Sequence, residues 1–372
     1  GTGVWVAISM IGVSAIGMML FTSRPVGDAM ATTIWGTSSS WTLTALPLFV
    51  WMGEILFRTK LSENLFKGLS PWMQKLPGGL IHVNVVGCAL FAAISGSSAA
   101  TVATVGKMSI PELRKRKYPE KILLGSLAGS GTLGLLIPPS IILIIYGVAV
   151  QESIAKLFIA GIIPGIMIAL IFMSYVIIWS LLNKNKMPKI TEEYTFIEKV
   201  KKSKQLLPVI ILILAVIGSI YTGVATATEA ASLGVVGALL LSYFQKSLNI
   251  ETFKSSLLGA TKTSCMIAFI LAGSTFLSLA MGFTGLPRNL ALWIQNMDLS
   301  PYVLIFVLMI FYIILGMFLD GISAVVLTMA IIEPMIRQAG FDMIWFGIFL
   351  VIVVEMAQIT PPVGFNLFVL QG

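Results

Sequence analysis

Four long stretches without a charged residue constrain this chain more than any other feature of its sequence. No Asp, Glu, Lys or Arg occurs in residues 122–150, 157–182, 206–228 or 299–319. A membrane-spanning helix needs roughly 20 apolar residues, so each stretch is long enough to span. The apolar residues run continuously and do not alternate with polar ones, which argues against the strands of a β-barrel. We therefore predict an all-α polytopic membrane protein surrounded by a lipid bilayer.

The composition supports a membrane protein, and the distribution of the basic residues explains the positive net charge without a nucleic-acid partner. Only 11% of the 372 residues are charged and 57% are apolar, whereas a soluble domain carries about 25% charged residues. The formal net charge is +8, but the basic residues gather in short segments between apolar runs, at 114–121 and 184–204. Such segments mark the cytoplasmic side of a membrane. We therefore predict that both segments are cytoplasmic, and we do not expect nucleic acid as a partner.

Two stretches of the chain, residues 94–113 and 319–336, resemble one another. Each has a turn of small residues and an apolar arm with a Pro, and a Pro pair begins 27 residues after that arm Pro. The matching residues are Gly96, Ser98, Pro111 and Pro138-Pro139 in the first repeat, and Gly321, Ser323, Pro334 and Pro361-Pro362 in the second. A basic cluster follows only the first stretch, which predicts that the two repeats have opposite orientations. Inverted repeats are typical of secondary transporters.

Each repeat interrupts its own helices. We predict re-entrant helical hairpins at residues 79–113 and 301–336, each turning at its small residues. A discontinuous helix follows each hairpin, at 121–150 and 343–372, because a Pro pair removes two N–H donors and disfavours helical geometry in the residue before it. Unpaired backbone groups are costly in lipid, so these breaks must be buried in protein or line a wet cavity.

A hairpin turn that faces a broken helix offers carbonyl and hydroxyl oxygens to a cation, and helix N-termini to a carboxylate. We therefore predict two Na⁺ sites, with an organic anion bound between them. The first site takes Ser95, Gly96, Ser97, Ser98, Gly131, Thr132 and Pro138, and the second takes Asp320, Gly321, Ser323, Thr360, Pro361 and Gly364. The alternative is that these Gly, Ser and Pro residues only permit kinks and close helix packing.

Four carboxylates fall within apolar segments, where an ionisable residue is a candidate for function. Asp320 directly precedes the Gly of the second turn and is the strongest candidate, although a carboxylate in that position can also serve as a helix cap. We expect Glu54, Glu229 and Glu355 to pair with basic residues or to lie at an interface.

Several motifs give the chain a specific resemblance to a known family. The segments ALPLFVWMGEIL (45–56), ISGSSAATVATVG (94–106), GSGTLGLLIPPSIILIIYG (129–147) and ITPPVGFN (359–366) resemble the large membrane subunit of tripartite ATP-independent periplasmic (TRAP) transporters, in the ion-transporter superfamily. This resemblance implies Na⁺-coupled import of an organic acid anion, a carboxylate or a sulfonate, across the bacterial inner membrane. It also implies two partners, a small four-helix membrane subunit and a periplasmic substrate-binding protein.

The resemblance further implies an elevator mechanism, in which a transport domain moves against a fixed scaffold. We expect the scaffold in residues 1–75 and 157–300, the latter with a cytoplasmic loop at 183–204, and the two halves of the transport domain in 76–156 and 301–372. By the same resemblance, the substrate-binding residues are Ser97, Ser98, Pro139, Ser140, Ser323, Pro362 and Asn366.

Other classes of protein fit the sequence less well. An anion channel, which needs a continuous pore, and an ion-coupled carrier that works without a binding protein are the alternatives. An intramembrane enzyme would need a nucleophile with its base, or a metal, but the chain has one His and two Cys and lacks the H-E-x-x-H pattern. An ATP-driven pump would need a phosphate-binding G-x-x-x-x-G-K-[ST] loop, and the sequence has none. We therefore do not expect an enzyme.

Overall fold

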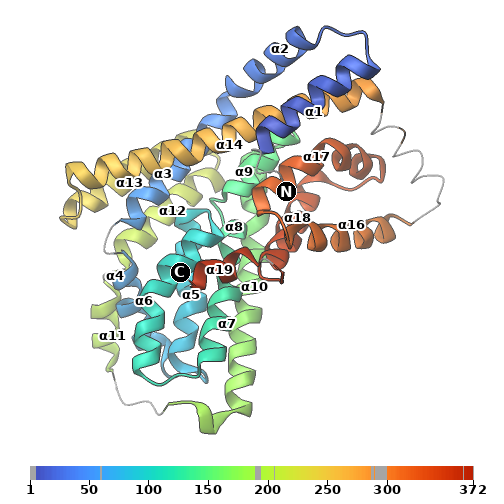
Figure 1. The fold of residues 1–372 in the computed structure, drawn as a ribbon. Helices are drawn as coiled ribbons and strands as arrows, with labels where there is room; N and C mark the ends of the chain where they lie inside the picture. Colours follow the sequence, from blue (N-terminus) through green and yellow to red (C-terminus); the bar gives the residue numbers. More distant parts are fainter. Residues whose placement is uncertain are drawn as a thin grey trace.

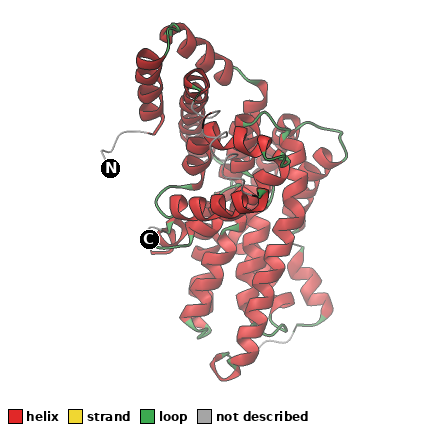
Figure 2. Ribbon diagram, turned by 90° about the vertical axis from the view of Figure 1, so that its right-hand side faces the viewer, coloured by secondary structure: helices red, strands yellow, loops and turns green. Residues whose placement is uncertain are grey.

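The computed structural model describes residues 6–58, 61–188, 194–204, 206–285, 289, 300–362 and 364–371. Within these ranges every regular element is a helix, as Figure 2 shows, which confirms the all-α prediction. In this part of the chain four helices are long and apolar enough to cross a membrane, and the number reaches seven if each bent pair counts as one span.

A set of helices from the N-terminal part and the middle of the chain packs together. Their bounds are α1 Val6–Phe21, α2 Val26–Ser38, η1 Trp41–Thr44, α3 Ala45–Phe57, α12 Leu207–Tyr221, α13 Ala227–Phe244 and α14 Ile250–Thr284. Helix α14 contacts α1, α2 and α3, while α13 contacts α3 and α12, and Figure 1 shows α1, α13 and α14 across one side of the molecule. Small residues permit this approach, because a Cβ on Gly273 would lie 2.9 Å from the Ala7 carbonyl oxygen.

Two short helices pair beside this set. They are α4 (Leu61–Met73) and α11 (Phe196–Ser203). The Trp72 indole N–H donates a hydrogen bond to the Ser203 hydroxyl at 2.7 Å, and the rings of Trp72 and Phe196 meet edge to face with centroids 6.1 Å apart. This contact holds the charged segment before α12 against the N-terminal part of the chain.

The turn of small residues in the first repeat separates two packed helices. After a short η2 (Gly79–Ile81), α5 (His82–Ser95) ends at Gly96. Gly96 takes φ +59°, a left-handed conformation that glycine adopts without steric penalty. Ser97 then caps α6 (Ser98–Lys115) with its hydroxyl, as is common at helix N-termini. The chain therefore makes a helical hairpin at this point.

The helix that follows this hairpin is broken at its Pro pair. Helices α7 (Glu120–Gly131) and α8 (Leu133–Leu136) meet α9 (Ile141–Ala149) at a bend of 40°. Ile137, directly before the pair, is extended at φ −76° and ψ 122°, which is the conformation that a following Pro favours. Ser140 then caps α9 with its hydroxyl, so the helix restarts immediately after the pair.

The last part of the chain has the same order of elements. A hairpin of α16 (Pro301–Gly316) and α17 (Gly321–Gln338) precedes α18 (Met343–Gln358), and α19 (Phe365–Gln371) follows the second Pro pair. Asp320 caps α17. Both Pro pairs contain a cis peptide bond.

The helix caps give a different register between the repeats from the one suggested by the glycines. Ser97 lies 14 residues before Pro111, and Asp320 lies 14 residues before Pro334. The two capping residues therefore correspond. An alignment of Gly96 with Gly321 differs from this one by two residues. The reason is that Gly96 directly precedes its capping residue, whereas Gly321 directly follows its own.

The two basic clusters lie at the same end of the molecule. The loop between α6 and α7 and the C-terminal end of α10 (Ile154–Leu182) both lie at the lower end of Figure 1. Tyr118 in that loop packs on the same apolar cluster as Trp179 and Met187 near the end of α10. One face of a membrane can therefore hold both clusters, as the predicted topology requires.

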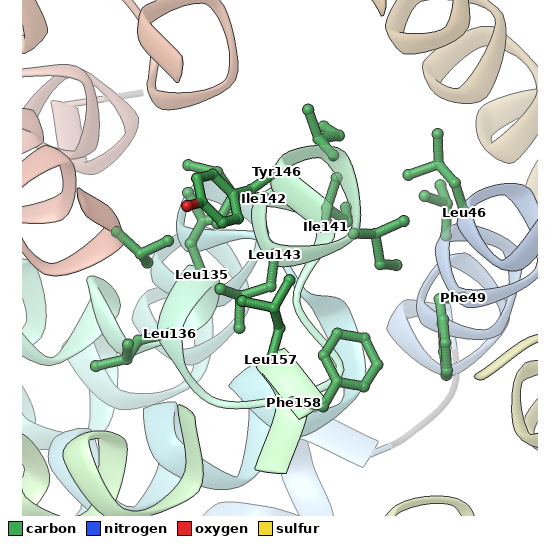
Figure 3. Close-up of a cluster of buried hydrophobic side chains, with 14 of the residues drawn as sticks. Leu46, Phe49, Leu135, Leu136, Ile141, Ile142, Leu143, Tyr146, Leu157 and Phe158 are labelled. Carbon is green, nitrogen blue, oxygen red and sulfur yellow. The ribbon is translucent and has the colours of Figure 1, made fainter. Parts of the chain in front are cut away.

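An apolar core surrounds the break of the first broken helix, as Figure 3 shows. Side chains of α8 and α9 lie beside Phe158 of α10, which meets Phe49 of α3 edge to face with ring centroids 5.7 Å apart. Tyr146 of α9 is fully buried, and its hydroxyl donates a hydrogen bond to the Met343 carbonyl of α18 at 2.6 Å. The broken helix is thus fixed to both halves of the chain.

Gly134 provides a test of the packing between α8 and the first hairpin. A Cβ on Gly134 would lie 2.6 Å from the Ser97 carbonyl oxygen and 2.6 Å from the Ser98 Cα, and backbone atoms cannot rotate away. We expect Gly134→Ala to lower the stability of the purified protein by about 1–3 kcal/mol, the usual cost of overpacking, in thermal unfolding in detergent. Gly125→Ala is the control, because nothing lies within 4 Å of a Cβ there; equal effects would contradict the packing.

Candidate functional site

The turn of the first hairpin rests on the break of the first broken helix. The Ile141 N–H, at the start of α9, donates a hydrogen bond to the Gly96 carbonyl at 3.3 Å. A Cβ on Gly96 would lie 2.8 Å from the Pro139 carbonyl oxygen, so a larger residue would separate the two segments. The structure therefore brings residues 95–98 up to the Pro pair and pairs backbone groups that an interrupted helix leaves free.

Hydroxyl groups stabilise this turn from within. The Ser95 and Thr101 hydroxyls are 2.8 Å apart, and the Thr101 hydroxyl donates to the Ser97 carbonyl at 2.7 Å. Thr101 was not among the predicted site residues, because a single Thr in the first turns of an apolar helix has no distinctive pattern. The turn thus gathers two hydroxyl oxygens and one carbonyl oxygen, which are ligands that hard cations prefer.

The predicted residues of the first break are buried, and each has a local partner. The Thr132 hydroxyl donates to the carbonyl three residues earlier at 2.6 Å, and the Ser140 hydroxyl donates to the Leu135 carbonyl. Gly131 faces Val102 of α6 so closely that a Cβ would overlap that side chain. Because both hydroxyl protons are engaged, Thr132 and Ser140 can ligate a cation only through their oxygen lone pairs.

Pro138 and Pro139 also line a small hollow with Phe158 of α10 and with Val216 and Ile220 of α12. Every residue that lines this hollow is apolar, so it does not suit an organic anion. The ring of Pro139 therefore belongs to an apolar wall, while its carbonyl faces the turn of the first hairpin.

Asp320 caps a helix in this structure. Its carboxylate accepts a hydrogen bond from the Ser323 N–H at 3.1 Å. Asp320 is exposed, whereas Ser323 is buried. This is the geometry of the helix-cap alternative. A capping carboxylate still has free lone pairs, so the cap does not by itself exclude a role as a cation ligand.

The predicted residues around the second Pro pair are divided between surface and core. Pro361 and Pro362 are exposed, and the Thr360 hydroxyl donates to the carbonyl four residues earlier at 2.8 Å. Gly364 has φ +58° and leads into α19, which packs on α6 and α7. Asn366 is completely buried there, and its amide atoms have no hydrogen-bond partner among the described residues. Asn366 thus lies in α19, the helix that packs on α6 and α7 of the first repeat.

The second hairpin meets the second broken helix at Gln358, the last residue of α18. Gln358 is 2% exposed, and its Oε1 accepts a hydrogen bond from the Ser98 hydroxyl at 3.1 Å. Its amide nitrogen occupies the space that a Cβ on Gly321 would need. One side chain thus contacts the first residue of α6 and the first residue of α17. Gln358 was not among the predicted site residues, because one Gln in an apolar helix forms no pattern.

Three further carboxylates were candidates, and of these Glu355 is buried without a partner among the described residues. Glu54 pairs with Arg58, and Glu229 accepts the Thr226 N–H at 2.8 Å in a capping box at the start of α13. Glu355 is 3% exposed, and neither of its carboxylate oxygens has a hydrogen-bond partner in the described part of the chain. Among the described residues the expectation that Glu355 pairs with a basic residue is therefore wrong.

Together these features define a class of protein. Spanning helices, a helix broken by a Pro pair and a hairpin turn with buried oxygen atoms packed on that break are typical of a secondary transporter. Residues 1–372 match the sequence family described as "Tripartite ATP-independent periplasmic transporter, DctM component". The chain belongs to this family, and it is a multi-pass inner-membrane transporter subunit rather than an enzyme.

Known relatives agree with this assignment. The C4-dicarboxylate TRAP transporter large permease protein DctM of Pseudomonas aeruginosa is 33% identical over 356 residues, which cover 95% of this chain and 82% of that protein. The isethionate TRAP transporter permease protein DctMQ of Oleidesulfovibrio alaskensis is 30% identical over 373 residues, or 100% of this chain and 58% of that protein. The crystal structure of the Alcanivorax borkumensis YdaH transporter has a TM-score of 0.65 at 12% identity, covers 98% of this chain and 89% of its own, and has a similar fold.

A double-mutant cycle tests the contact between the halves. We expect Ser98→Ala and Gln358→Leu to be non-additive by about 0.5–1.5 kcal/mol, the usual net contribution of one hydrogen bond, in chemical unfolding of the purified protein. The control cycle combines Ser98→Ala with Thr261→Ala, whose hydroxyl is exposed and bonds within its own helix. Additive effects in the first cycle would contradict the contact.

Proposed function

We propose that this protein carries an organic acid anion, a carboxylate or a sulfonate, into the cell and couples that movement to Na⁺. The names of its relatives support the substrate class, since one is named for C4-dicarboxylates and another for isethionate, which is a sulfonate. The observation that carries the coupling to Na⁺ is the contact between Gly96 and Ile141. It places unwound backbone from two elements together, beside the oxygen atoms of Ser95, Ser97 and Thr101.

Two Na⁺ sites are part of the proposal. The first uses Ser95, Gly96, Ser97, Ser98, Gly131, Thr132 and Pro138, and the second uses Asp320, Gly321, Ser323, Thr360, Pro361 and Gly364. Their support is that each half has a capped helix after its turn and a Pro pair downstream of it. The organic anion lies between them, where the N-termini of α6 and α17 supply partial positive charge.

The proposed movement is that of an elevator. Residues 76–156 and 301–372 form the transport domain, and residues 1–75 and 157–300 form the scaffold. Support comes from the packing of α18 on α8 and α9 and of α19 on α6 and α7, because these contacts join the two proposed halves of the moving domain. The contacts of α14 with α1, α2 and α3 join the proposed scaffold in the same way.

Two partners complete the proposed system. A periplasmic substrate-binding protein delivers the anion, and a small four-helix membrane subunit supports the scaffold. The fused name of the DctMQ relative supports the second partner, because this chain covers only 58% of that protein.

Uptake into liposomes tests the proposed function. We expect the chain, reconstituted with both partners, to take up a C4-dicarboxylate or isethionate along an inward Na⁺ gradient, saturably and not along a K⁺ gradient. Uptake that does not saturate would indicate a channel. Uptake that is unchanged without the binding protein would indicate a carrier that works alone, and uptake that ignores Na⁺ would contradict the coupling.

Two substitutions of Asp320 separate its cap from an ion-binding role. Asp320→Asn keeps a capping oxygen but removes the charge, whereas Asp320→Ala removes both. We expect the Asn variant to retain stability and to need a higher Na⁺ concentration for half-maximal uptake. The Ala variant should additionally lose about 0.5–2 kcal/mol of stability, the usual value of an N-cap. Unchanged Na⁺ dependence in the Asn variant would leave Asp320 as a helix cap only.

A further inference from the structure

The Glu355 carboxyl is buried without an opposite charge. It lies on α18, is 3% exposed, and has no hydrogen-bond partner for either oxygen among the described residues. An isolated carboxylate in a protein interior is strongly unfavourable unless something neutralises it. The neutralising partner must therefore be a basic side chain, a proton or a bound cation.

No basic side chain in the described elements around Glu355 is placed to neutralise it. Helices α8, α9 and α16 carry no charged residue, and Lys156 of α10 is exposed. Arg337 of α17 pairs with Glu333 at 2.9 Å. The first basic residue along α6, Lys107, is exposed as well. These positions leave a proton or a cation.

Oxygen atoms from two further side chains lie beside Glu355. Gln358 is three residues further along α18, on the same face of the helix. Ser98 is the first residue of α6, and its contact with Gln358 places the start of α6 beside this end of α18. The single proton of the Ser98 hydroxyl is given to Gln358 Oε1 at 3.1 Å, so the Ser98 oxygen can offer only lone pairs to anything bound at Glu355. Carboxylate, hydroxyl and amide oxygens thus converge from both halves of the chain.

We propose that Glu355, Ser98 and Gln358 bind Na⁺ at the contact between the two halves. A set of ligands made only of oxygen, including one carboxylate, suits a hard cation. This inference rests on the proposed coupling to Na⁺ and adds to it a ligand that carries a full negative charge. Because Glu355 lies beside the N-terminus of α6, its unneutralised charge repels an organic anion there. The bound cation removes that repulsion, which makes Na⁺ binding and anion binding mutually favourable.

Direct binding of Na⁺ tests this site. Radioactive sodium ion is bound at equilibrium to the purified chain in complex with its small subunit, without substrate. We expect Glu355→Gln, which keeps the shape of the side chain and removes the charge, to bind one Na⁺ fewer per chain. Glu355→Asp keeps the charge and should retain the ion with weaker affinity. Glu112→Gln is the matched control, since that carboxylate is only partly buried and pairs with Arg116 near the end of α6, and the variant should bind as many ions as the wild type.

The outcomes separate this site from the coupling itself. Equal Na⁺ binding by Glu355→Gln and by the wild type overturns the proposed site. If Na⁺ binding is equal and uptake by Glu355→Gln also loses a pH dependence that the wild type has, Glu355 carries a proton instead. Absence of Na⁺ binding to the wild type overturns the coupling as well. If Glu355→Gln does not fold, Gln358→Leu gives the second test, because it removes an oxygen ligand that belongs to neither of the two Na⁺ sites proposed above. It should raise the half-saturating Na⁺ concentration, and an unchanged value overturns the site.

Discussion

The structure depends on one constraint, which is that backbone groups freed by an interrupted helix need partners in a low-dielectric environment. In the first half the two interruptions satisfy each other, because the Gly96 carbonyl accepts from the Ile141 N–H. This contact fixes the residue types around it, since Gly96 and Gly134 have no space for a Cβ. The oxygen atoms of the candidate ion site are thus a consequence of how the breaks are paired.

The same pairing connects the halves of the chain. Gln358 accepts from Ser98 and fills the space beside Gly321, and Tyr146 donates to Met343. A change at the first turn therefore acts directly on the end of α18. In a carrier, such contacts allow an ion bound in one half to change the conformation of the other half. A ligand shifts the equilibrium between two conformations when it binds one of them more tightly.

Much of this architecture follows from local sequence, and the rest depends on contacts between distant residues. The uncharged runs predict the helices, and the Pro pair at 138–139 predicts a break because Pro acts on its immediate neighbours. The register between the repeats was misjudged by two residues, since the glycines mark turns but the caps at Ser97 and Asp320 begin the helices. Gln358 was missed and Glu355 misassigned, because their partners are defined only by the packing of both halves.

In the proposed mechanism, the first hairpin turn and the Pro-pair break together enclose a cation. A high-resolution cryo-EM map of the chain with its partners in lipid, recorded with and without Na⁺, tests it most directly. We expect the map with Na⁺ to show a density ligated by oxygen atoms of residues 95–98 and of the facing break, and the map without Na⁺ to lack it. An ordered turn without such a density, in a preparation whose uptake is driven by Na⁺, would show that the turn and the break do not bind the coupling ion.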